Sequence, residues 1–402
     1  MAKPLPEDPF IRDLVVRAQR AQLSRRSVLK GAGVSAAALS LAACSTGGSA
    51  KPKAAKDISD TDKTVRWDNW ALYLDVDDDG NYPSLQGFEK QTGIKATYTE
   101  AVDDNDTYYG KVKDQLKLGQ DIGCDTVCLT DWMVARWIRF GYTQELDHSV
   151  MPNLKNLTPA LQDVDFDPGR KMSVPWQGGF AGIAWNKDQI PGGLTSVSDL
   201  WDPSLKGRVG VLSEMRDTMG CIMQDLGTQI DKKWGDAEFT AAIDVLQKQV
   251  TDGQIRNIKG NSYKEDLVNG DTLAAIVWSG DITQLNAENG EHWEFAVPSK
   301  GGTLWNDNFL IPIGSEHKKN AEALINYYYD PEVAAMVAAW VNYIPPVVGT
   351  KEAMMAIDPD LANNQLIFPS DATLANTHVF RTLTAAEEQK YGTQFQAILL
   401  GA

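Results

Sequence analysis

Strand-like and helix-like segments alternate along residues 63–141 of this chain. β-Branched and aromatic residues fill KTVRWDNWALYL and IKATYTEAV, which predicts two strands. Apolar residues at helical spacing in YPSLQGFEKQTG and TYYGKVKDQLKLGQ predict the helices that separate the strands. The segment CDTVCLTDWMVARWIRFG predicts a buried strand that continues into a helix. This alternation is typical of an α/β fold with a parallel sheet.

A second α/β set is predicted further along the chain. The segment MSVPWQGGFAGIAWN is extended, and its glycines, Gly178, Gly179 and Gly182, fit a crossover between two lobes. A second group of strands and helices follows in SDLWDPSLKGRVGVL, DTMGCIMQDLGTQI and LAAIVWSGD, and GTLWNDNFLIPIG returns as a strand. The helix-like run over residues 320–344 must break or restart at Asp330-Pro331, because proline interrupts helical hydrogen bonding.

The first 44 residues are predicted to be a targeting segment outside the fold. Residues 24–30, SRRSVLK, are typical of a twin-arginine export signal, and the apolar run that follows is too short to span a bilayer. Residues 41–44, Leu-Ala-Ala-Cys, match a lipobox, in which Cys44 would carry a lipid thioether and become the new N-terminus. Residues 45–61 are predicted to be a flexible spacer. The alternative is an ordinary signal peptide that contains a cysteine.

Removal of the targeting segment leaves a strongly acidic protein. The 402-residue chain has 38 Lys plus Arg and 54 Asp plus Glu, of which residues 1–44 hold 7 basic and 3 acidic ones, so 31 and 51 remain. Such a surface disfavours nucleic acid and anionic lipid as partners and suits a cationic small molecule. The remaining length of about 358 residues is more than one core usually serves, which predicts two domains.

The cysteines and histidines do not predict a metal site, and no cofactor is expected. Cys124 and Cys128 stand four residues apart in a predicted strand, roughly 13 Å, which is too far for a disulfide between them. With Cys221 they form an odd set, so at least one thiol is free once Cys44 is lipidated. The four histidines are scattered along the chain, and we interpret the cysteines as buried structural residues.

The sequence DVDDDG, which starts at Asp75, begins like a calcium-binding loop. Such a loop needs a bidentate Glu at its twelfth position, where this chain has Gln86. The segment before the aspartates is strand-like, whereas a calcium loop of this kind follows a helix. We therefore expect a solvated turn before a helix at Ser84, with calcium binding as the alternative.

No catalytic motif is found in the sequence. It has no phosphate-binding Gly-Lys-Ser/Thr loop, no nucleophile elbow and no His-Glu-x-x-His motif. We therefore expect a binding protein and not an enzyme. The alternative is an exported hydrolase in which Glu214 and Asp217 act as paired carboxylates.

Seven segments carry a family resemblance: NWALY, GFEKQTGI, DTVCLTDWMV, PWQGGFAGIAWN, DLWDPSLKG, LWNDNFLIP and ALINYYYDPEVAAMVA. In this order they resemble the bacterial extracellular polyamine-binding proteins, the spermidine/putrescine receptors of ABC importers. The resemblance covers about residues 64–395 and implies a two-lobed, periplasmic-binding-protein-like α/β fold of class II type with several hinge crossovers. It implies one lobe from residues 62–178 and 305–350 and another from 179–304 and 351–402, which close around the ligand.

The resemblance also implies the ligand-binding residues. They are Trp70, Tyr73, Thr130, Trp132, Glu214, Asp217, Trp278, Trp305, Asp307 and Tyr343, with Asn69 in the first motif. A protonated diamine has two ammonium ends, which need carboxylates, and a methylene chain, which needs flat apolar walls. Aromatic faces attract an ammonium by about 0.5–2 kcal/mol each. Taken singly, each tryptophan fits a core position as readily as a ligand wall.

One position departs from the family pattern and leaves the preferred ligand open. The family often has Asp or Glu before the tyrosine of the first motif, where this chain has Leu72. Thiamine, an amino-acid derivative or a sugar remain as alternatives to a polyamine. The expected partners are the polyamine and ABC permease subunits, and no nucleic acid. We expect a monomer that is exported by the twin-arginine route and held by Cys44 on the outer face of the cytoplasmic membrane.

Overall fold

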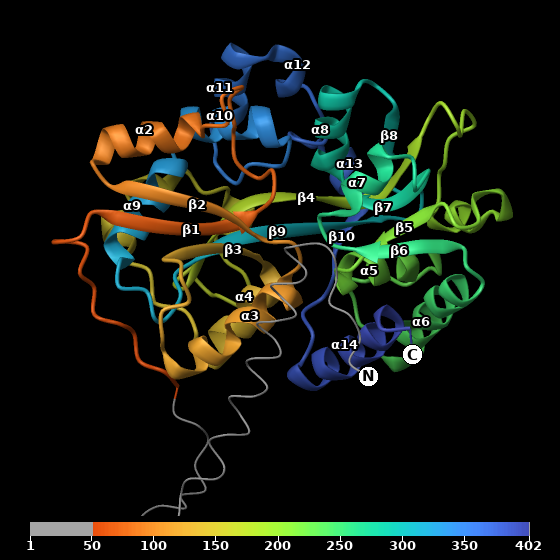
Figure 1. Ribbon diagram of the computed structural model, residues 1–402, viewed down its shortest axis with the longest axis horizontal. Coiled ribbons are helices and arrows are strands. Elements are labelled where there is room, and N and C mark those ends of the chain that lie inside the picture. The colour runs from red at the N-terminus through yellow and green to blue at the C-terminus, as the bar shows by residue number, and fades with distance from the viewer. Residues whose placement is uncertain (1–50, 402) are drawn as a thin grey trace, which may run out of the picture. The chain divides into compact units, whose positions relative to one another are not determined.

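A computed structural model describes residues 51–401 of the chain, and one ten-stranded sheet runs through them (Figure 1). The predicted export signal, the lipobox with Cys44 and residues 45–50 of the predicted spacer lie outside the described residues. The rest of that spacer makes backbone hydrogen bonds, from Ala55 N to Ile313 O (3.0 Å) and from Ile58 N to Glu316 O (2.8 Å). Within residues 51–401, no helix has the length and apolar character to cross a membrane.

The strands follow the order β2-β1-β3-β9-β4-β7-β5-β6, with β10 paired to β9 and β8 paired to β4. Their bounds are β1 Thr64–Trp70, β2 Lys95–Val102, β3 Thr126–Thr130, β4 Ser173–Asn186, β5 Val209–Leu212, β6 Ile255–Lys259, β7 Ala274–Trp278, β8 Trp293–Ala296, β9 Gly302–Leu310 and β10 Thr377–Val379.

The two ends of the sheet repeat one arrangement. At one end, β1 lies between β2 and β3, and all three are parallel. At the other end, β5 lies between β6 and β7, again in parallel. Each parallel group borders an antiparallel strand, β9 next to β3 and β4 next to β7. The two predicted α/β sets are therefore confirmed as the two halves of one sheet.

Strands β4 and β9 connect the halves, because β9 pairs with β3, β4 pairs with β7, and the two pair with each other. They are antiparallel to each other, from Ser173 opposite Leu310 to Ala181 opposite Thr303. A Cβ atom at Gly179, near the middle of β4, would lie 2.6 Å from Trp305 Cζ2. Glycine is therefore required where β4 passes under this side chain, because real Cβ contacts are not that short.

Helices cover both faces of the sheet. In Figure 1, α2, α8 and α10–α12 lie above the sheet, whereas α3–α6 and α14 lie below it. The helices are α2 Pro83–Thr92, α3 Asn105–Leu118, α4 Asp131–Phe140, α5 Met215–Asp225, α6 Asp236–Thr251, α7 Tyr263–Val268, α8 Ser279–Asn289, α9 Lys318–Tyr328, α10 Pro331–Val341, α11 Thr350–Ile357, α12 Pro359–Ala362, α13 Asp371–Leu374 and α14 Ala385–Leu399.

Glycine and proline mark two helix boundaries, and the second of them confirms the predicted break at Asp330-Pro331. Helix α2 ends at Gly93, which adopts the left-handed conformation (φ 73°) that favours glycine at this position. The long helical run restarts between α9 and α10, where Pro331 is the first residue of α10. The Asp330 side chain accepts a hydrogen bond from the Glu332 N–H and thereby caps the new helix.

The core of the first half is aromatic. The fully buried Trp67 of β1 packs against Tyr98, Trp176, Phe309 and Tyr328 at ring-centroid distances of 5.0–5.3 Å. Aromatic pairs at this separation add to the stabilisation that comes from burial of apolar area. This packing holds β1, β4 and β9 together beneath the strand ends that carry the candidate site. The cysteines Cys124, Cys128 and Cys221 are buried, as predicted, and all three are free.

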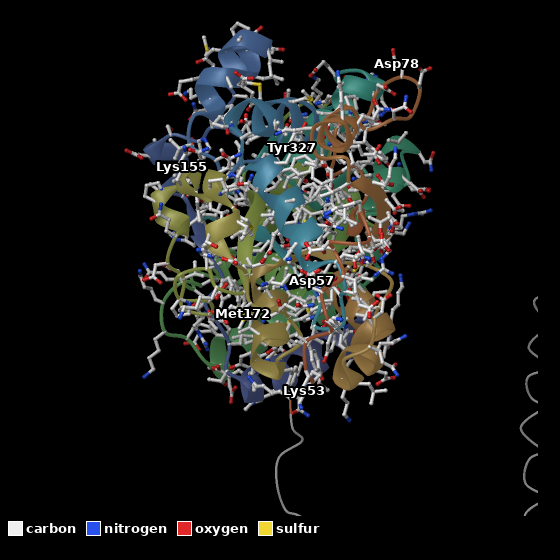
Figure 2. The ribbon with its side chains drawn as sticks, turned by 90° about the vertical axis from the view of Figure 1, so that its left-hand side faces the viewer. Lys53, Asp57, Asp78, Lys155, Met172 and Tyr327 are labelled. Carbon is white, nitrogen blue, oxygen red and sulfur yellow. The ribbon has the colours of Figure 1, made fainter. Side chains whose placement is uncertain are left out.

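The acidic run is only partly the solvated turn that the sequence predicts. Asp78 lies in an exposed turn at the edge of the molecule (Figure 2). Asp77 is also exposed, and it accepts hydrogen bonds from the backbone N–H groups of Asp79 and Asn81. Asp75, by contrast, is buried and accepts hydrogen bonds from the N–H and hydroxyl of Ser84 at the start of α2. Its placement in a solvated turn was therefore wrong.

Candidate functional site

A cavity where the two halves of the sheet meet is lined by nine of the ten predicted ligand-binding residues. Its walls are Trp70, Ala71, Tyr73, Thr130, Glu214, Asp217, Asn261, Trp278, Asp281, Trp305, Asp307 and Tyr343. Trp70, Thr130 and Trp278 are the last residues of β1, β3 and β7, so the carboxyl ends of strands from both halves meet here. The free volume is about 30 Å³, which has room for no more than a few water molecules.

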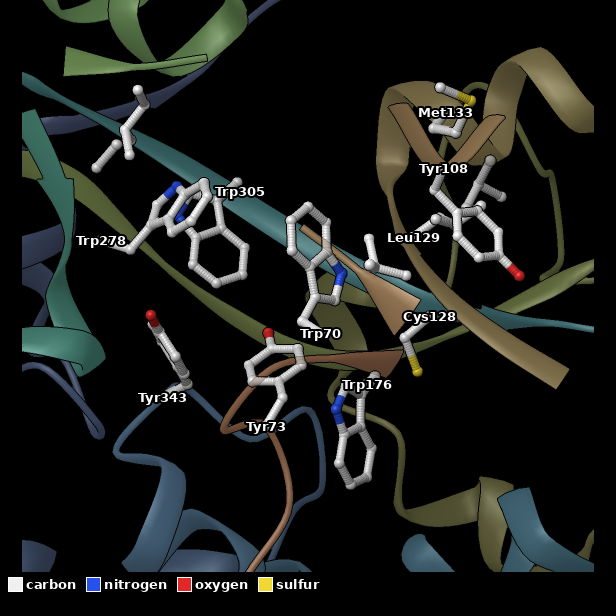
Figure 3. Close-up of a cluster of buried hydrophobic side chains, with 14 of the residues drawn as sticks. Trp70, Tyr73, Tyr108, Cys128, Leu129, Met133, Trp176, Trp278, Trp305 and Tyr343 are labelled. Carbon is white, nitrogen blue, oxygen red and sulfur yellow. The ribbon is translucent and has the colours of Figure 1, made fainter. Parts of the chain in front are cut away.

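The aromatic side chains that line this cavity are Trp70, Tyr73, Trp278, Trp305 and Tyr343, and Figure 3 shows them grouped together. The rings of Trp70 and Trp278 meet at 5.9 Å and 76°, and those of Tyr73 and Tyr343 at 5.4 Å and 83°. The Trp305 ring lies 5.2 Å from that of Tyr343. Among the described residues, the indole N–H groups of Trp70 and Trp305 and the hydroxyl of Tyr73 have no hydrogen-bond partner. The site therefore combines apolar walls with unused polar groups.

Three buried carboxylates give the cavity its negative charge. Glu214, Asp217 and Asp307 are only 5%, 7% and 4% exposed, and no Lys or Arg within residues 51–401 forms an ion pair with them. Burial raises the pKa of Asp307 to about 7 and that of Asp217 to about 6, and it holds the pKa of Glu214 well above its ordinary value. A bound cation would stabilise the ionised forms of all three.

Hydrogen bonds hold two of these carboxylates in place. Thr130 Oγ1 donates to Asp307 Oδ1 at 2.7 Å, which joins the end of β3 to β9. Trp278 Nε1 donates to Asp217 Oδ2 at 2.9 Å, which joins the end of β7 to the first turn of α5. These neutral donors leave the carboxylate charges uncompensated.

Glu214 belongs to a series of hydrogen bonds that links the two halves of the sheet through Asn105. The Asn105 backbone N–H and side-chain amide both donate to Glu214 Oε1, at 2.7 and 2.8 Å. The same side-chain amide donates to Thr130 Oγ1 at 2.8 Å, and that hydroxyl donates to Asp307. Because Asn105 is the first residue of α3, Glu214 also lies at the positive end of a helix dipole. This series of hydrogen bonds connects Glu214 to Asp307.

A fourth carboxylate, Asp281, was missed by the sequence analysis. It accepts hydrogen bonds from the hydroxyls of Tyr343 (2.9 Å) and Tyr263 (2.8 Å) and forms an ion pair with Lys264 Nζ at 3.3 Å. Asp281 follows Trp278 by three residues, on the first turn of α8. That spacing places it on the side of the helix that faces the strand end, a signal that was present in the sequence.

Ala71 and Asn261 also line the cavity and were not predicted. The Asn261 side-chain amide donates to the Ala71 carbonyl at 2.9 Å, which joins the two halves of the sheet at the rim. Ala71 follows directly after β1, whereas Asn261 lies in the turn between β6 and α7. Asparagine in a turn gives no sequence signal for a ligand site, because turns use it for local hydrogen bonds.

Three residues of the predicted motifs lie outside this cavity. Trp132 lines a neighbouring cavity, where the guanidinium carbons of Arg216 and Arg136 lie 4.1 and 4.8 Å from its ring centroid. Asn69 is fully buried and does not reach the cavity wall. Leu72 adopts a left-handed conformation (φ 57°), and its N–H donates to Glu100 Oε1 at 2.8 Å. The position before the motif tyrosine is thus not part of this wall.

The comparisons with known proteins agree on one family. Residues 84–367 match the family model described as bacterial extracellular solute-binding protein. The spermidine/putrescine-binding periplasmic protein of Salmonella typhimurium is 30% identical over 327 residues, which cover 80% of this chain and 87% of that protein. The putrescine-binding periplasmic protein PotF of Escherichia coli is 29% identical over 325 residues, which cover 76% of this chain and 83% of that protein.

A solved structure gives the same result for the fold. The spermidine/putrescine ABC transporter substrate-binding protein PotD from Streptococcus pneumoniae superimposes with a TM-score of 0.67 at 25% identity, and covers 84% of this chain and 99% of that chain. The predicted periplasmic-binding-protein-like fold class and the predicted family are therefore confirmed. This chain belongs to the bacterial extracellular solute-binding proteins.

Proposed function

We propose that this protein is an extracytoplasmic receptor that binds a polyamine of the putrescine or spermidine type and delivers it to an ABC permease. The observation that carries the proposal is the set of three buried carboxylates, Glu214, Asp217 and Asp307, for which residues 51–401 offer no paired cation. Two similar proteins support the same ligand class, the spermidine/putrescine-binding protein of Salmonella typhimurium and the putrescine-binding protein PotF of Escherichia coli.

The chemistry of the walls fits this ligand. A protonated diamine brings two ammonium groups, each with three donors, to carboxylates that are otherwise buried without a counter-charge. Its methylene chain packs on Trp70, Trp305 and Tyr343, and the ring faces add cation–π attraction at each end. A sugar or a neutral ligand would leave the carboxylates unpaired, which costs several kcal/mol per buried ion. Binding leaves the amine chemically unchanged in this proposal.

Closure of two lobes traps the ligand in this proposal. One lobe comprises residues 62–178 and 305–350 and the other residues 179–304 and 351–402, with β4 and β9 as the hinge crossovers. A free volume of about 30 Å³ is too small for a diamine, so the ligand reaches the cavity only when the walls separate. Hinge closure of two domains around a ligand is a common way to meet that requirement.

A lipid anchor at Cys44 keeps the receptor at the outer face of the cytoplasmic membrane in this proposal, next to its permease, as an exported monomer. The lipobox of residues 41–44 and the twin-arginine motif of residues 24–30 support it. A Cys44→Ala variant should be exported but no longer attached to the membrane, because it lacks the acylated thiol. Cell fractionation measures this, and a variant that stays in the membrane fraction would refute the anchor.

A thermal-shift screen of the purified mature protein tests the ligand class. Putrescine, cadaverine, spermidine, spermine and agmatine should be compared with thiamine and sugars. A ligand that binds only the folded state raises the free energy of unfolding by RT ln(1 + [L]/Kd), about 4 kcal/mol at 1,000 times Kd. We expect a clear rise in Tm with at least one polyamine. A rise with thiamine or a sugar and none with any amine would refute the proposed function.

A further inference from the structure

Ion pairs between the two proposed lobes meet at one residue, Glu388. It belongs to α14, in the lobe of residues 179–304 and 351–402, whereas its partners Arg136 and Arg139 belong to α4, in the other lobe. Arg136 Nη2 lies 2.7 Å from Glu388 Oε1, and Arg139 Nη2 lies 2.7 Å from Glu388 Oε2. No other ion pair within residues 51–401 joins the two lobes.

The carboxylate of Glu388 is shielded from solvent. Its side chain is 9% exposed, and that of Arg136 is 15% exposed. Burial acts to raise the pKa of Glu388, but the nearby arginines outweigh burial and hold that pKa below its ordinary value. Glu388 is therefore ionised at neutral pH. Salt and water screen a pair in such a place much less than a pair at the surface.

Each side of this ion-pair cluster is fixed to its own lobe. Helix α4 continues directly from β3, and Arg136 is also paired with Asp106 of α3 at 2.7 Å. Helix α14 packs against α6 of the other lobe, where the rings of Tyr391 and Phe239 stack at 4.2 Å. Both α4 and α14 lie below the sheet in Figure 1. Separation of the lobes would therefore pull Glu388 away from both arginines.

Trp132, the predicted ligand-binding residue that lies outside the carboxylate cavity, belongs to the same interface. It is on α4, and the guanidinium carbon of Arg216, from the other lobe, lies 4.1 Å from its ring centroid. Arg136 lies over the same ring at 4.8 Å. Cation–π attraction thus adds a second contact between the lobes next to the ion pairs of Glu388.

This interface is separate from the walls that would hold the ligand. None of Trp132, Arg136, Arg139, Arg216 and Glu388 lines the carboxylate cavity. A change at Glu388 therefore leaves the carboxylates and aromatic walls of that cavity in place. Any effect of such a change on binding has to act through the position of the two lobes.

We propose that Trp132, Arg136 and Arg139 of one lobe and Arg216 and Glu388 of the other form a clasp that stabilises the closed arrangement of the lobes. The inference rests on the proposed function, which includes closure around a ligand. When a ligand binds the open protein and is then enclosed, its affinity includes the closing equilibrium. The clasp therefore raises the affinity for every enclosed ligand by a similar factor, although it touches none of them.

Glu388→Gln tests the clasp, because it removes the charge and nearly keeps the size of the side chain. Loss of one partner of a buried charge pair acts mainly on dissociation, so putrescine and spermidine should each bind at least about tenfold more weakly and dissociate correspondingly faster. The ratio of the two affinities should change by less than about threefold, because the clasp does not contact the ligand. Titration calorimetry measures the affinities, and stopped-flow fluorescence measures the rates.

Glu387→Gln is the matched control on the same helix. Glu387 is paired with Arg381 at 2.6 Å, and both residues belong to one lobe. The variant loses the same charge from α14, and glutamine can replace glutamate in the capping box that begins this helix. It should bind both amines as the wild type does. An equal loss of affinity in Glu387→Gln would overturn the inference, because the effect would then come from the charge of α14 and not from a contact between the lobes.

Three further measurements decide the inference. Arg139→Gln should also weaken binding, and the double variant with Glu388→Gln should lose less than the product of the two single losses, because the residues act together. Unchanged affinity and dissociation in Glu388→Gln, with its fold checked by circular dichroism, would overturn the clasp. A wild type that binds no amine would refute the proposed function instead. The clasp would then be judged by small-angle X-ray scattering without ligand: Glu388→Gln should have a larger radius of gyration than wild type and Glu387→Gln, and equal values would overturn it.

Discussion

Replacement of Asp307 by Asn should weaken putrescine binding by at least about tenfold and raise the Tm of the ligand-free protein at pH 8. Asp307 is 4% exposed, so the ammonium that pairs with it is closed off from water on binding. Truncation of one side of a buried charged hydrogen bond costs about 2–5 kcal/mol, or roughly 30- to several-thousand-fold in Kd. We take tenfold as the lower bound because the closed cavity can admit some water. Titration calorimetry measures the loss.

The rise in Tm has a separate cause. Burial raises the pKa of Asp307 from its ordinary value to about 7, so at pH 8 the ligand-free fold holds a buried, ionised group. That ionisation destabilises the fold by on the order of a few kcal/mol relative to the unfolded chain. Asn keeps an acceptor for the Thr130 hydroxyl but has no charge. Opposite changes in affinity and stability would show that Asp307 serves binding and not folding.

Asp77→Asn is the matched control. Asp77 is exposed and accepts only from local groups of its own turn, so its replacement should change putrescine affinity by less than about threefold. Asp217→Asn should behave like Asp307→Asn. If Asp77→Asn abolished binding while the two cavity variants bound normally, the assignment of the amine site would be wrong, and the acidic turn would be the place to look for a ligand.

The pH dependence gives a second readout of the same carboxylates. Because the pKa values of Asp217 and Asp307 are raised to about 6 and 7, both groups are largely protonated at pH 5 in the ligand-free fold. A dication needs them ionised, so affinity should rise from pH 5 to pH 8, and Asp307→Asn should flatten this profile. Stability changes in the opposite direction: the contribution of each raised pKa is present at low pH and is lost as the pH rises from about 4 to 7.

Much of the fold follows from local sequence. Strand segments of β-branched and aromatic residues predict β1 and β3, and the ends of those strands carry Trp70 and Thr130. Proline and glycine set the helix boundaries at Pro331 and Gly93. Proline cannot continue a helix from its preceding residues, and glycine adopts the left-handed conformation that ends one. The ligand-binding residues themselves were predicted from the family resemblance, and the position of Trp70 and Thr130 at strand ends explains why they meet in one cavity.

The remaining features depend on contacts between segments that are far apart in sequence. Trp132 stands only two residues after Thr130, yet Trp132 lines the neighbouring cavity. There the guanidinium of Arg216, from the other half of the sheet, lies over the Trp132 ring. The ion pair between Asp281 and Lys264 could not be predicted from the sequence either. The two residues are seventeen positions apart, so their distance in space is set only when the elements that carry them pack together. Long charged side chains reach several partners, so only the packed structure selects one.

Replacement of Asn105 by Ala should shorten the lifetime of the putrescine complex at least about tenfold while changing the association rate by less than about threefold. Asn105 is fully buried, and its side chain is the only described group that joins Glu214 to Thr130. In the proposed two-lobed division, Asn105 and Thr130 lie in one lobe and Glu214 in the other. The hydrogen bond from the Asn105 side-chain amide to Glu214 therefore forms when the lobes close. Loss of such a contact acts mainly on dissociation, because the open state in which ligand enters does not contain it.

Stopped-flow fluorescence separates the two rates, since Trp70, Trp278 and Trp305 line the cavity and should report ligand directly. The matched control is Asn363→Ala, which removes an exposed asparagine whose amide donates only to the nearby Pro359 carbonyl. A double-mutant cycle with Glu214→Gln tests whether the two residues act together; contacting residues in one network show interaction energies of about 0.5–3 kcal/mol. A slower association with an unchanged lifetime would show that Asn105 shapes the open cavity, and closure would then have to depend on other contacts between the lobes.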